Sequence, residues 1–266
     1  DRVTCDGTIN CGACAYCRSG LLNLCDNRRV LGVSCDDYRR HGAFAEFVAV
    51  PQRVLYALPD GISFVEAAMV EPLAVAAHAV SRATIEAEAS IVVVGTGIIG
   101  LLIIETLVAS GCERVIAVDI NPHRLESALQ IGAAAALRSD HEDVPRAVQD
   151  LTDGRGADVA FEAAGIRPTV RLAINVLRKN GTVVLVGNVE PTVDLPLQSV
   201  VTRQLTLRSS AASCGEYPSC IDQIVRRRVD VARLVSAVGP LADGAAWFER
   251  LRQPGSELLK VVLEPE

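Results

Sequence analysis

The sequence predicts an α/β fold whose middle part is a doubly wound parallel sheet, flanked at both chain ends by segments with smaller β structure. Two observations lead to this prediction. From residue 91 onward, short runs rich in β-branched residues alternate with helical stretches. A glycine-rich turn also stands between the first of these strands and its helix. With 266 residues and 50% hydrophobic side chains, the chain can bury the core of one large domain or two smaller ones.

The composition limits the partners of the chain. Its net charge is −6, and nucleic acids and anionic membranes attract basic faces, so we expect neither as a partner. Residues 91–110 have the apolar length of a membrane span, but Glu105 interrupts them and glycines stand where a strand would turn into a helix. The odd count of nine cysteines, with some clustered, favours reduced thiols and a cytoplasmic protein. Because the first residue is Asp1 and not Met, we expect an upstream segment to be missing.

Four cysteines lie close together near the N-terminus. They are Cys11, Cys14, Cys17 and Cys25. The spacing C-x2-C-x2-C-x7-C lets consecutive turns present four sulfurs to one Zn²⁺, which takes four thiolates tetrahedrally at about 2.3 Å. Four protein ligands leave no position for water or substrate, so the spacing predicts a structural zinc. Free cysteines acting as small hydrophobes are the alternative. Cys5 and Cys35 break the spacing, and we expect them to be ordinary buried thiols.

Short strands and then a helix are predicted after the cysteine cluster. Residues 43–50, AFAEFVAV, show a rough alternation, and residues 54–59, VLYALP, form a second apolar run before a turn. Ser63 and Glu66 form a capping box ahead of an alanine-rich helix. Glu71 precedes a proline and would stand at the positive end of a helix dipole. A helix-capping carboxylate is its ordinary interpretation, and a catalytic or ligand role is the alternative.

The middle of the chain carries the clearest motif. Residues 91–94 form a β-branched strand that runs into the turn GTGIIG, and an apolar helix follows. In this context Gly95 permits a tight turn, Gly97 lets the backbone approach a pyrophosphate, and Gly100 allows helix and strand to pack closely. Asp119 ends the second strand and is placed to accept hydrogen bonds from ribose hydroxyls. The motif therefore predicts a dinucleotide-binding Rossmann fold.

The alternation of strands and helices continues to the C-terminus. Two helices are predicted, from Asn121-Pro122 to Gly132 and from Pro168 to Asn180-Gly181. Strands are predicted at 157–165, 182–187 and 203–210. A helix around 220–227, an amphipathic stretch near Trp247 and a strand at 258–263 complete the chain.

The order of these motifs resembles that of the zinc-containing medium-chain alcohol dehydrogenases over essentially the whole chain, most closely their sorbitol (polyol) dehydrogenase branch. The motifs are the four-cysteine stretch, GAFAEFVAV, EPLAVAAHAV, IVVVGTGIIG with its acid, and FERLRQPGSELLKVVLEP. The resemblance implies a catalytic, GroES-like β domain formed by residues 1–80 and 214–266, incomplete at its N-terminus. It implies an NAD-binding Rossmann domain formed by residues 81–213.

The resemblance also implies site residues. Glu71 becomes a ligand of a catalytic zinc. The cofactor-binding set consists of the three glycines with Ile98 and Ile99, Asp119 and Arg124. In the family, a cysteine and a histidine complete the catalytic zinc site, and their positions fall upstream of Asp1. We therefore expect a catalytic zinc and alcohol oxidation only in a longer chain.

Together, these features predict an NAD-dependent zinc dehydrogenase that oxidises a secondary alcohol, of polyol or sugar-derived type, to a ketone. The family implies a dimer or tetramer. Asp119 would repel the 2′-phosphate of NADP, so NAD is the expected cofactor. Residues 209–218, SSAASCGEYP, lack the Arg-Tyr pair of animal sorbitol dehydrogenases, which leaves the substrate open. The alternatives are a zinc-free NADPH-dependent reductase of the same superfamily and a non-catalytic NAD-binding or zinc-stabilised interaction protein.

Overall fold

The chain forms two compact units, and it passes from one unit to the other at two points. The computed structural model describes residues 1–33, 38–253 and 255–265. One unit consists of Asp1–Ala74 with Ala212–Glu266, and the other of Val75–Ala211. The first change of unit lies within helix α3 (Val70–Ser81), and the second follows the last strand of the central sheet. The domain boundaries expected from the sequence, after residues 80 and 213, stay a prediction.

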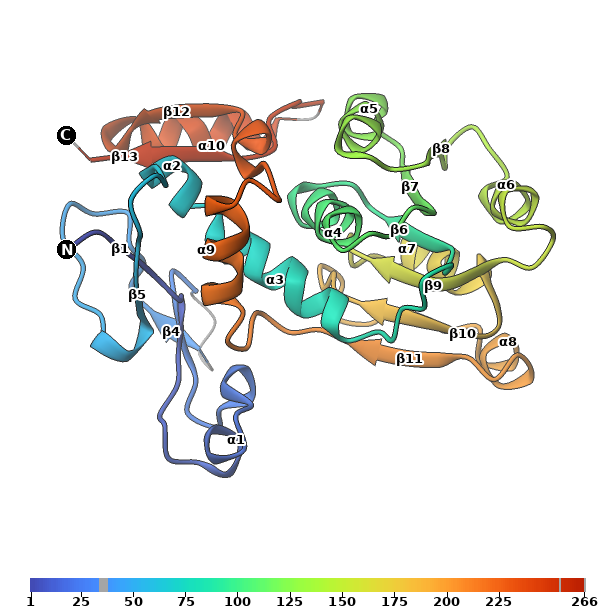
Figure 1. Ribbon diagram of the computed structural model, residues 1–266, viewed down its shortest axis with the longest axis horizontal. Coiled ribbons are helices and arrows are strands. Elements are labelled where there is room, and N and C mark those ends of the chain that lie inside the picture. The colour runs from blue at the N-terminus through green and yellow to red at the C-terminus, as the bar shows by residue number, and fades with distance from the viewer. Residues whose placement is uncertain (34–37, 254, 266) are drawn as a thin grey trace. The chain divides into compact units, whose positions relative to one another are not determined.

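The unit Val75–Ala211 contains a six-stranded sheet of parallel strands in the order β11-β10-β9-β6-β7-β8 (Figure 1). The strands are β6 (Ile91–Val94), β7 (Val115–Asp119), β8 (Ala135–Arg138), β9 (Ala157–Glu162), β10 (Leu177–Leu185) and β11 (Thr206–Ser209). The order in which strands are added to the sheet changes sides at β6: β7 and β8 lie on one side of β6, and β9, β10 and β11 lie on the other. Ligands of such sheets bind at this switch point, beyond the carboxyl ends of the strands.

Helices cover both faces of this sheet. They are α4 (Ile98–Ala109), α5 (Pro122–Ile131), α6 (Val144–Leu151), α7 (Arg167–Asn175) and α8 (Leu197–Thr202). Val92 and Val94 of β6 share a buried cluster with residues of α6 and α7. Side chains alternate between faces along a strand, so the equally buried Ile91 and Val93 face the opposite layer, where α4 packs on β6. This two-sided burial explains why β6 is an uninterrupted apolar run.

The sequence predicted several boundaries in this unit correctly. Residues 91–110 are split into β6, a turn and α4, so they do not form one membrane-length helix. Asn121 caps α5 through bonds from the backbone N–H groups of His123 and Arg124, and Gly132 ends the helix with φ +122°. The parallel α/β architecture is confirmed.

Other boundaries in this unit were predicted wrongly. The helix expected to end at Asn180-Gly181 ends at Asn175 instead, and β10 already begins at Leu177. Asn180 has φ +60° and lies in an irregularity where the register of β10 against β9 shifts. A turn signal inside a strand therefore marked a bulge and not a helix end. Strand β8 and helices α6 and α8 were not predicted at all.

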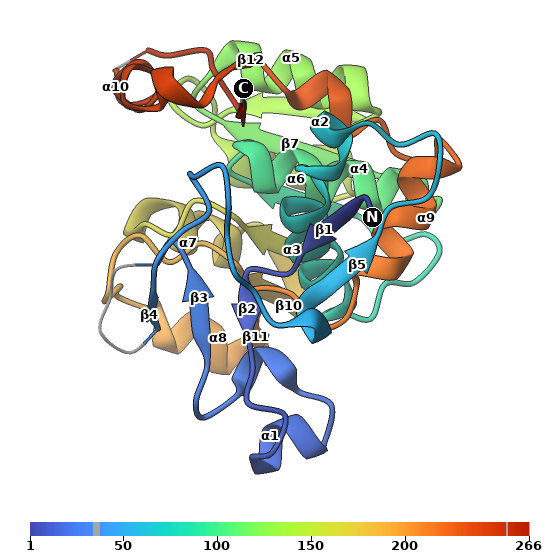
Figure 2. The ribbon, with the colours of Figure 1, turned by 90° about the vertical axis from the view of Figure 1, so that its left-hand side faces the viewer.

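The other unit is built from short strands and helices (Figure 2). Its strands are β1 (Val3–Cys5), β2 (Thr8–Ile9), β3 (Arg29–Leu31), β4 (Arg39–Arg40), β5 (Leu55–Ala57), β12 (Ala237–Pro240) and β13 (Val261–Glu264). They form the small sheets β1-β5, β2-β3-β4 and β12-β13. The helices that lie wholly in this unit are α1 (Ala15–Arg18), α2 (Phe64–Ala67), α9 (Tyr217–Val225) and α10 (Gly244–Arg252).

Contacts between distant parts of the chain hold this unit together. The Tyr217 ring stacks on the Tyr56 ring with centroids 4.8 Å apart, and the Tyr217 hydroxyl donates to the Cys5 carbonyl at 3.3 Å. The predicted capping box is confirmed, since Ser63 and Glu66 bond reciprocally at the start of α2. Glu66 also pairs with Arg227, just past the end of α9. The N-terminal and C-terminal segments therefore share one core.

The strand predicted at 43–50 is wrong. These residues have no regular structure, and among the described residues no strand pairs with them. Phe44, Phe47 and Val48 are 69%, 89% and 45% exposed. An apolar alternation forms a strand only where a neighbouring strand takes its hydrogen bonds and a core takes its side chains. Here Phe44 makes an edge-to-face contact with Phe248, with centroids 5.6 Å apart, and no strand of the described chain pairs with the segment.

Two further expectations concern single segments. Cys5 is only half-buried, not buried as expected, and Cys35 lies outside the described residues. One stretch of the described chain, Phe64–Ser81, is helical, long and apolar enough to cross a membrane by length and composition. Half of it is buried inside the fold, as in a core helix, so it is weak support for a membrane span.

Candidate functional site

The four clustered cysteines come together in space. Their Sγ atoms all lie within 4.8 Å of one another, and those of Cys11 and Cys17 are 4.0 Å apart. Four thiolates around one Zn²⁺ at about 2.3 Å stand about 3.8 Å from each other, so the donor set fits a tetrahedral zinc. Cys14 caps the one-turn helix α1 and Cys25 follows a 3-10 turn at Leu22–Leu24, and these turns aim the sulfurs inward.

Backbone N–H groups surround these sulfurs. Cys11 Sγ accepts from Ala13 N at 3.4 Å and from Cys14 N at 3.3 Å, and these bonds lower the pKa of Cys11 to about 6. The Cys17 N–H group lowers the pKa of Cys14 in the same way. Burial raises the pKa of Cys17 to about 12. The N–H groups thus favour thiolates at two positions, whereas Cys17 has to release a proton when a metal binds.

A second site lies at the switch point of the central sheet. A cavity of about 710 Å³ opens there, lined by Gly95, Gly97, Asp119, Arg124 and residues of the turn after β9. A Cβ atom on Gly97 would meet nothing within 4 Å, so this glycine leaves room against the cavity. Ile98 and Ile99 begin α4 but do not line the cavity.

The glycine turn itself is tightly packed. Gly95 has φ +91°, in the left-handed region that favours glycine. A Cβ atom on Gly100 would lie 1.9 Å from the Gly95 carbonyl oxygen, so only glycine fits where α4 passes under the turn. The helix therefore begins close to the cavity and points its free N–H groups toward it, which suits a pyrophosphate.

Asp119 is held firmly at the end of β7. Its Oδ2 atom accepts from the Thr96 backbone N at 2.6 Å and from the Thr96 hydroxyl at 3.0 Å. Its Oδ1 atom accepts from the backbone N–H groups of Ile120 and Asn121 at 2.8 and 2.9 Å. The side chain links the glycine turn to the end of β7 and is 9% exposed. Each carboxylate oxygen of Asp119 already accepts two hydrogen bonds, so a ribose hydroxyl would have to share an oxygen with these donors. The ribose-binding role of Asp119 stays a prediction.

Some cavity residues were not predicted from the sequence. Ser139 and Asp140 line the cavity after β8, a strand that was missed, and Asp140 pairs with Arg138 at 2.6 Å. Thr96 was passed over as the variable position of the glycine motif, although it holds Asp119. The sequence could have indicated this role, because a threonine directly after the first glycine of the motif offers both a hydroxyl and a backbone N–H group to the acid at the end of the next strand.

Glu71 lies in the first turn of α3, as predicted. Its side chain reaches solvent, yet burial among neighbouring protein groups raises its pKa; Lys260 lowers it and Asp6 raises it further. Among the described residues, the four cysteines are the only group of three or more metal-binding side chains that come together. The described residues thus bring no further ligands to Glu71 and do not fit a second zinc, so no reaction step is assigned through one.

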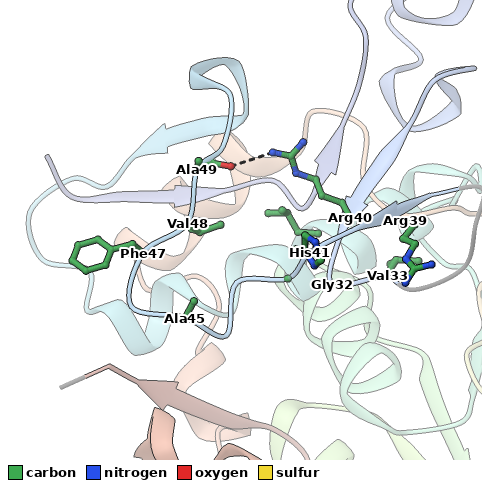
Figure 3. A pocket seen from close by; sticks show the side chains of 11 residues that line it. Gly32, Val33, Arg39, Arg40, His41, Ala45, Phe47, Val48 and Ala49 are labelled. Carbon is green, nitrogen blue, oxygen red and sulfur yellow. Dashed lines mark hydrogen bonds between the residues drawn. The ribbon is translucent and has the colours of Figure 1, made fainter.

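A further cavity, of about 890 Å³, lies beside the irregular segment 43–50 (Figure 3). Its walls include Gly32, Arg39, His41 and Val48. Figure 3 shows the Arg40 side chain reaching the Ala49 carbonyl, to which it donates at 3.1 Å. None of the predicted site residues lies in this cavity.

The fold and these sites define a class of protein, namely a dinucleotide-binding oxidoreductase with a thiolate zinc lobe. The comparison with protein families agrees. A model described as zinc-binding dehydrogenase matches residues 99–226, and one described as alcohol dehydrogenase GroES-like domain matches residues 1–60. The chain is 33% identical to the D-xylulose reductase A of Aspergillus oryzae over 257 residues, which is 95% of this chain and 71% of that protein. It is 29% identical to the sorbitol dehydrogenase of Bacillus subtilis over 266 residues, 100% of this chain and 74% of that protein.

Solved structures show the same fold. The alcohol dehydrogenase of Thermus sp. ATN1 is 30% identical, with a TM-score of 0.93 over 99% of this chain and 79% of its own. A zinc-binding dehydrogenase from Sinorhizobium meliloti 1021 bound to NADP is 28% identical, with a TM-score of 0.88 over 98% of this chain and 76% of its own. The chain belongs to the zinc-containing medium-chain alcohol dehydrogenases, with a polyol-dehydrogenase-like sequence. Zinc and a nicotinamide dinucleotide are the cofactors of this family.

Proposed function

We propose that this protein is an NAD-dependent dehydrogenase that oxidises a secondary alcohol of a polyol or sugar-derived substrate to a ketone. The observation that carries the proposal is the cavity at the switch point of the sheet, with Asp119 fixed at its rim. The substrate class rests on relatives named for D-xylulose and sorbitol. In the reaction, the alcohol carbon gives a hydride to the nicotinamide and the hydroxyl loses its proton, so NAD⁺ becomes NADH.

The charges around the cavity favour NAD over NADP. Asp119 and Asp140 line it, and Arg124 is the only basic side chain among its lining residues in the described chain. A 2′-phosphate near Asp119 would bring like charges together, because the carboxylate cannot swing away from its four hydrogen bonds. Arg138 already pairs with Asp140, so the charge that a 2′-phosphate would meet comes from Asp119, and Arg124 is the lining cation that can offset it in part.

The zinc that we assign to the cysteine cluster supports the fold and takes no part in the chemistry. All four tetrahedral positions would be filled by protein sulfur, which leaves none for the substrate. On the resemblance of its EP motif we keep Glu71 as the proposed ligand of a catalytic zinc, although the described residues supply no further ligands for that ion and no reaction step is assigned to it. We also place the protein in the cytoplasm as a dimer or tetramer. The eight described cysteines form no disulfide, which suits the cytoplasm, and β11 is an edge strand of its sheet, which leaves an edge for a second copy.

Cofactor titration and an alcohol assay test the proposal separately. The chain is titrated with NADH and NADPH by fluorescence, and NADPH is expected to bind at least tenfold more weakly, which is about 1.4 kcal/mol. Equal dissociation constants would contradict the preference for NAD, and binding of neither would contradict the function as a whole.

The assay then follows NADH formation from xylitol, sorbitol and ethanol. Faster reaction of the polyols supports the substrate class, and faster reaction of ethanol contradicts it. Tight NADH binding without turnover of any of these alcohols would support the cofactor site and contradict the proposed alcohol oxidation.

A further inference from the structure

A buried carboxyl group stands at the centre of the dinucleotide-binding sheet, and the sequence analysis did not single it out. Glu162 is the last residue of β9, pairs in register with Val94 of β6 and Leu185 of β10, and is 0% exposed. Its carbonyl oxygen accepts from the backbone N–H groups of Val186 and Gly187 at 2.8 and 3.0 Å. The residue thus lies where three strands end, directly before the turn that lines the cofactor cavity.

The side chain of Glu162 turns back onto that turn. Its Oε1 atom accepts from Ala164 N at 3.0 Å and from Gly165 N at 2.8 Å. Its Oε2 atom is buried and has no hydrogen-bond partner in the described chain. A buried polar atom without a partner costs about 1–3 kcal/mol. An apolar side chain would fill this space without that cost, so packing alone does not account for a carboxyl group here.

The turn that Glu162 holds is part of the cavity wall and is tightly packed against its neighbours. Ala163 and Ala164 line the cavity opposite the glycine turn. A Cβ atom on Gly95 would lie 3.1 Å from both the Cβ and the N atom of Ala164. Gly165 has φ +76°, and a Cβ atom there would lie 2.3 Å from Asn188 N. The turn is therefore confined between two neighbouring loops, and a small movement changes the cavity.

We propose that Glu162 is a positioning residue for the cofactor. Its Oε1 atom fixes the turn 163–165 and thereby sets the width of the cavity between Ala164 and Gly95. The inference rests on the proposed function, because it assumes that this cavity binds NAD. If the acceptor is lost, two buried N–H groups have no partner, and the turn shifts to find one. In the unaltered protein, Glu162 thus acts on the cofactor indirectly, because its carboxyl group bonds to the backbone of the turn and does not line the cavity.

The test compares four variants of the full chain by NADH titration. Glu162→Gln keeps an acceptor oxygen for both N–H groups, so its Kd is expected within threefold of the unaltered chain. Glu162→Leu removes the acceptor and is expected to weaken NADH binding at least tenfold. Glu162→Asp withdraws the oxygen by one methylene and should also weaken binding if the leucine variant does not fold. Phe161→Leu is the matched control, because Phe161 is 0% exposed but makes no bond to the turn; it should lower the thermal midpoint with an unchanged Kd.

Hydrogen exchange at the amides of Ala164 and Gly165 gives an independent readout. Exchange should speed up in the leucine and aspartate variants and not in the glutamine variant. A folded leucine or aspartate variant with unchanged Kd and unchanged exchange would overturn the inference. Equal losses of affinity in the glutamine and leucine variants would also overturn it, since charge and not the acceptor would then matter. If the unaltered chain binds no NADH, the proposed function fails, and the exchange data alone then show whether Glu162 holds the turn.

Discussion

Gly100→Ala and Gly97→Ala should separate the packing of the glycine turn from its role in cofactor binding. A methyl group on Gly100 would lie 1.9 Å from the Gly95 carbonyl oxygen, far inside van der Waals contact. The contact is with backbone, which cannot rotate away as a side chain could. Overpacking costs about 1–3 kcal/mol or more, and the higher helix propensity of alanine returns about 1 kcal/mol. Because the contact is so short, we expect a net loss near the upper end, about 2 kcal/mol.

A loss of this size is measurable. For a unit of this length, about 2 kcal/mol lowers the thermal midpoint by roughly 6 °C. The distorted turn should also weaken NADH binding in Gly100→Ala. Gly97→Ala is the matched control, because its methyl group would meet no protein atom within 4 Å and would enter the cavity. It should lose NADH affinity at least tenfold but less than about 1 kcal/mol of stability, from the weaker N-cap. Calorimetry measures the thermal midpoint of each variant, and titration measures its NADH affinity. A Gly100→Ala variant with unchanged midpoint and affinity would refute the packing argument.

Three other outcomes follow from the described contacts. Cys14→Ser should lower the zinc content from one ion per chain and lower the thermal midpoint, and unchanged metal analysis would exclude the cluster as the zinc site. Burial raises the pKa of Asp158, but bonds from Arg178 and the Ser90 N–H group outweigh it and lower the pKa overall. Its stabilisation is therefore fully present above about pH 4 and is lost as the pH falls through the lowered pKa of the folded state, so Asp158→Asn should destabilise the chain at pH 7 and progressively less as the pH falls below about 4. Phe47→Lys should reduce self-association in light scattering, because Phe47 is 89% exposed beside the exposed Phe44 and Val48; identical scattering would show that Phe47 does not contribute to self-association.

The sequence was most informative where one local pattern decides the structure. The glycine motif, the capping box at Ser63 and the cap at Asn121 each act within a few residues, and the structure contains all three elements. The cysteine cluster is similar, because its spacing alone brings four sulfurs together.

Prediction failed where distant residues decide. Residues 43–50 have the alternation of a strand but no strand partner in the described chain, which no local pattern reports. Strand β8 was missed because AALR lacks the β-branched residues that mark the other strands, and its burial comes from α5 packed against it. In the sequence, nothing distinguishes Glu162 from an ordinary exposed acid at the end of a strand. Only the register with β6 and β10 shows that it is fully buried.

The strand order of the central sheet has a consequence for how the cofactor cavity forms during folding. Ile91 pairs with Val115, 24 residues later, and on its other side with Val159, 68 residues later. Closing the longer loop costs about 0.9 kcal/mol more in chain entropy. The half of the sheet with the glycine turn and Asp119 is therefore expected to assemble first, and β9 adds to a surface that already exists. Pulse-labelled hydrogen exchange should then protect Val118 before Phe161, and the reverse order would contradict this sequence of events. A newly made chain would thus have a place for the pyrophosphate before it has the wall that Ala164 provides.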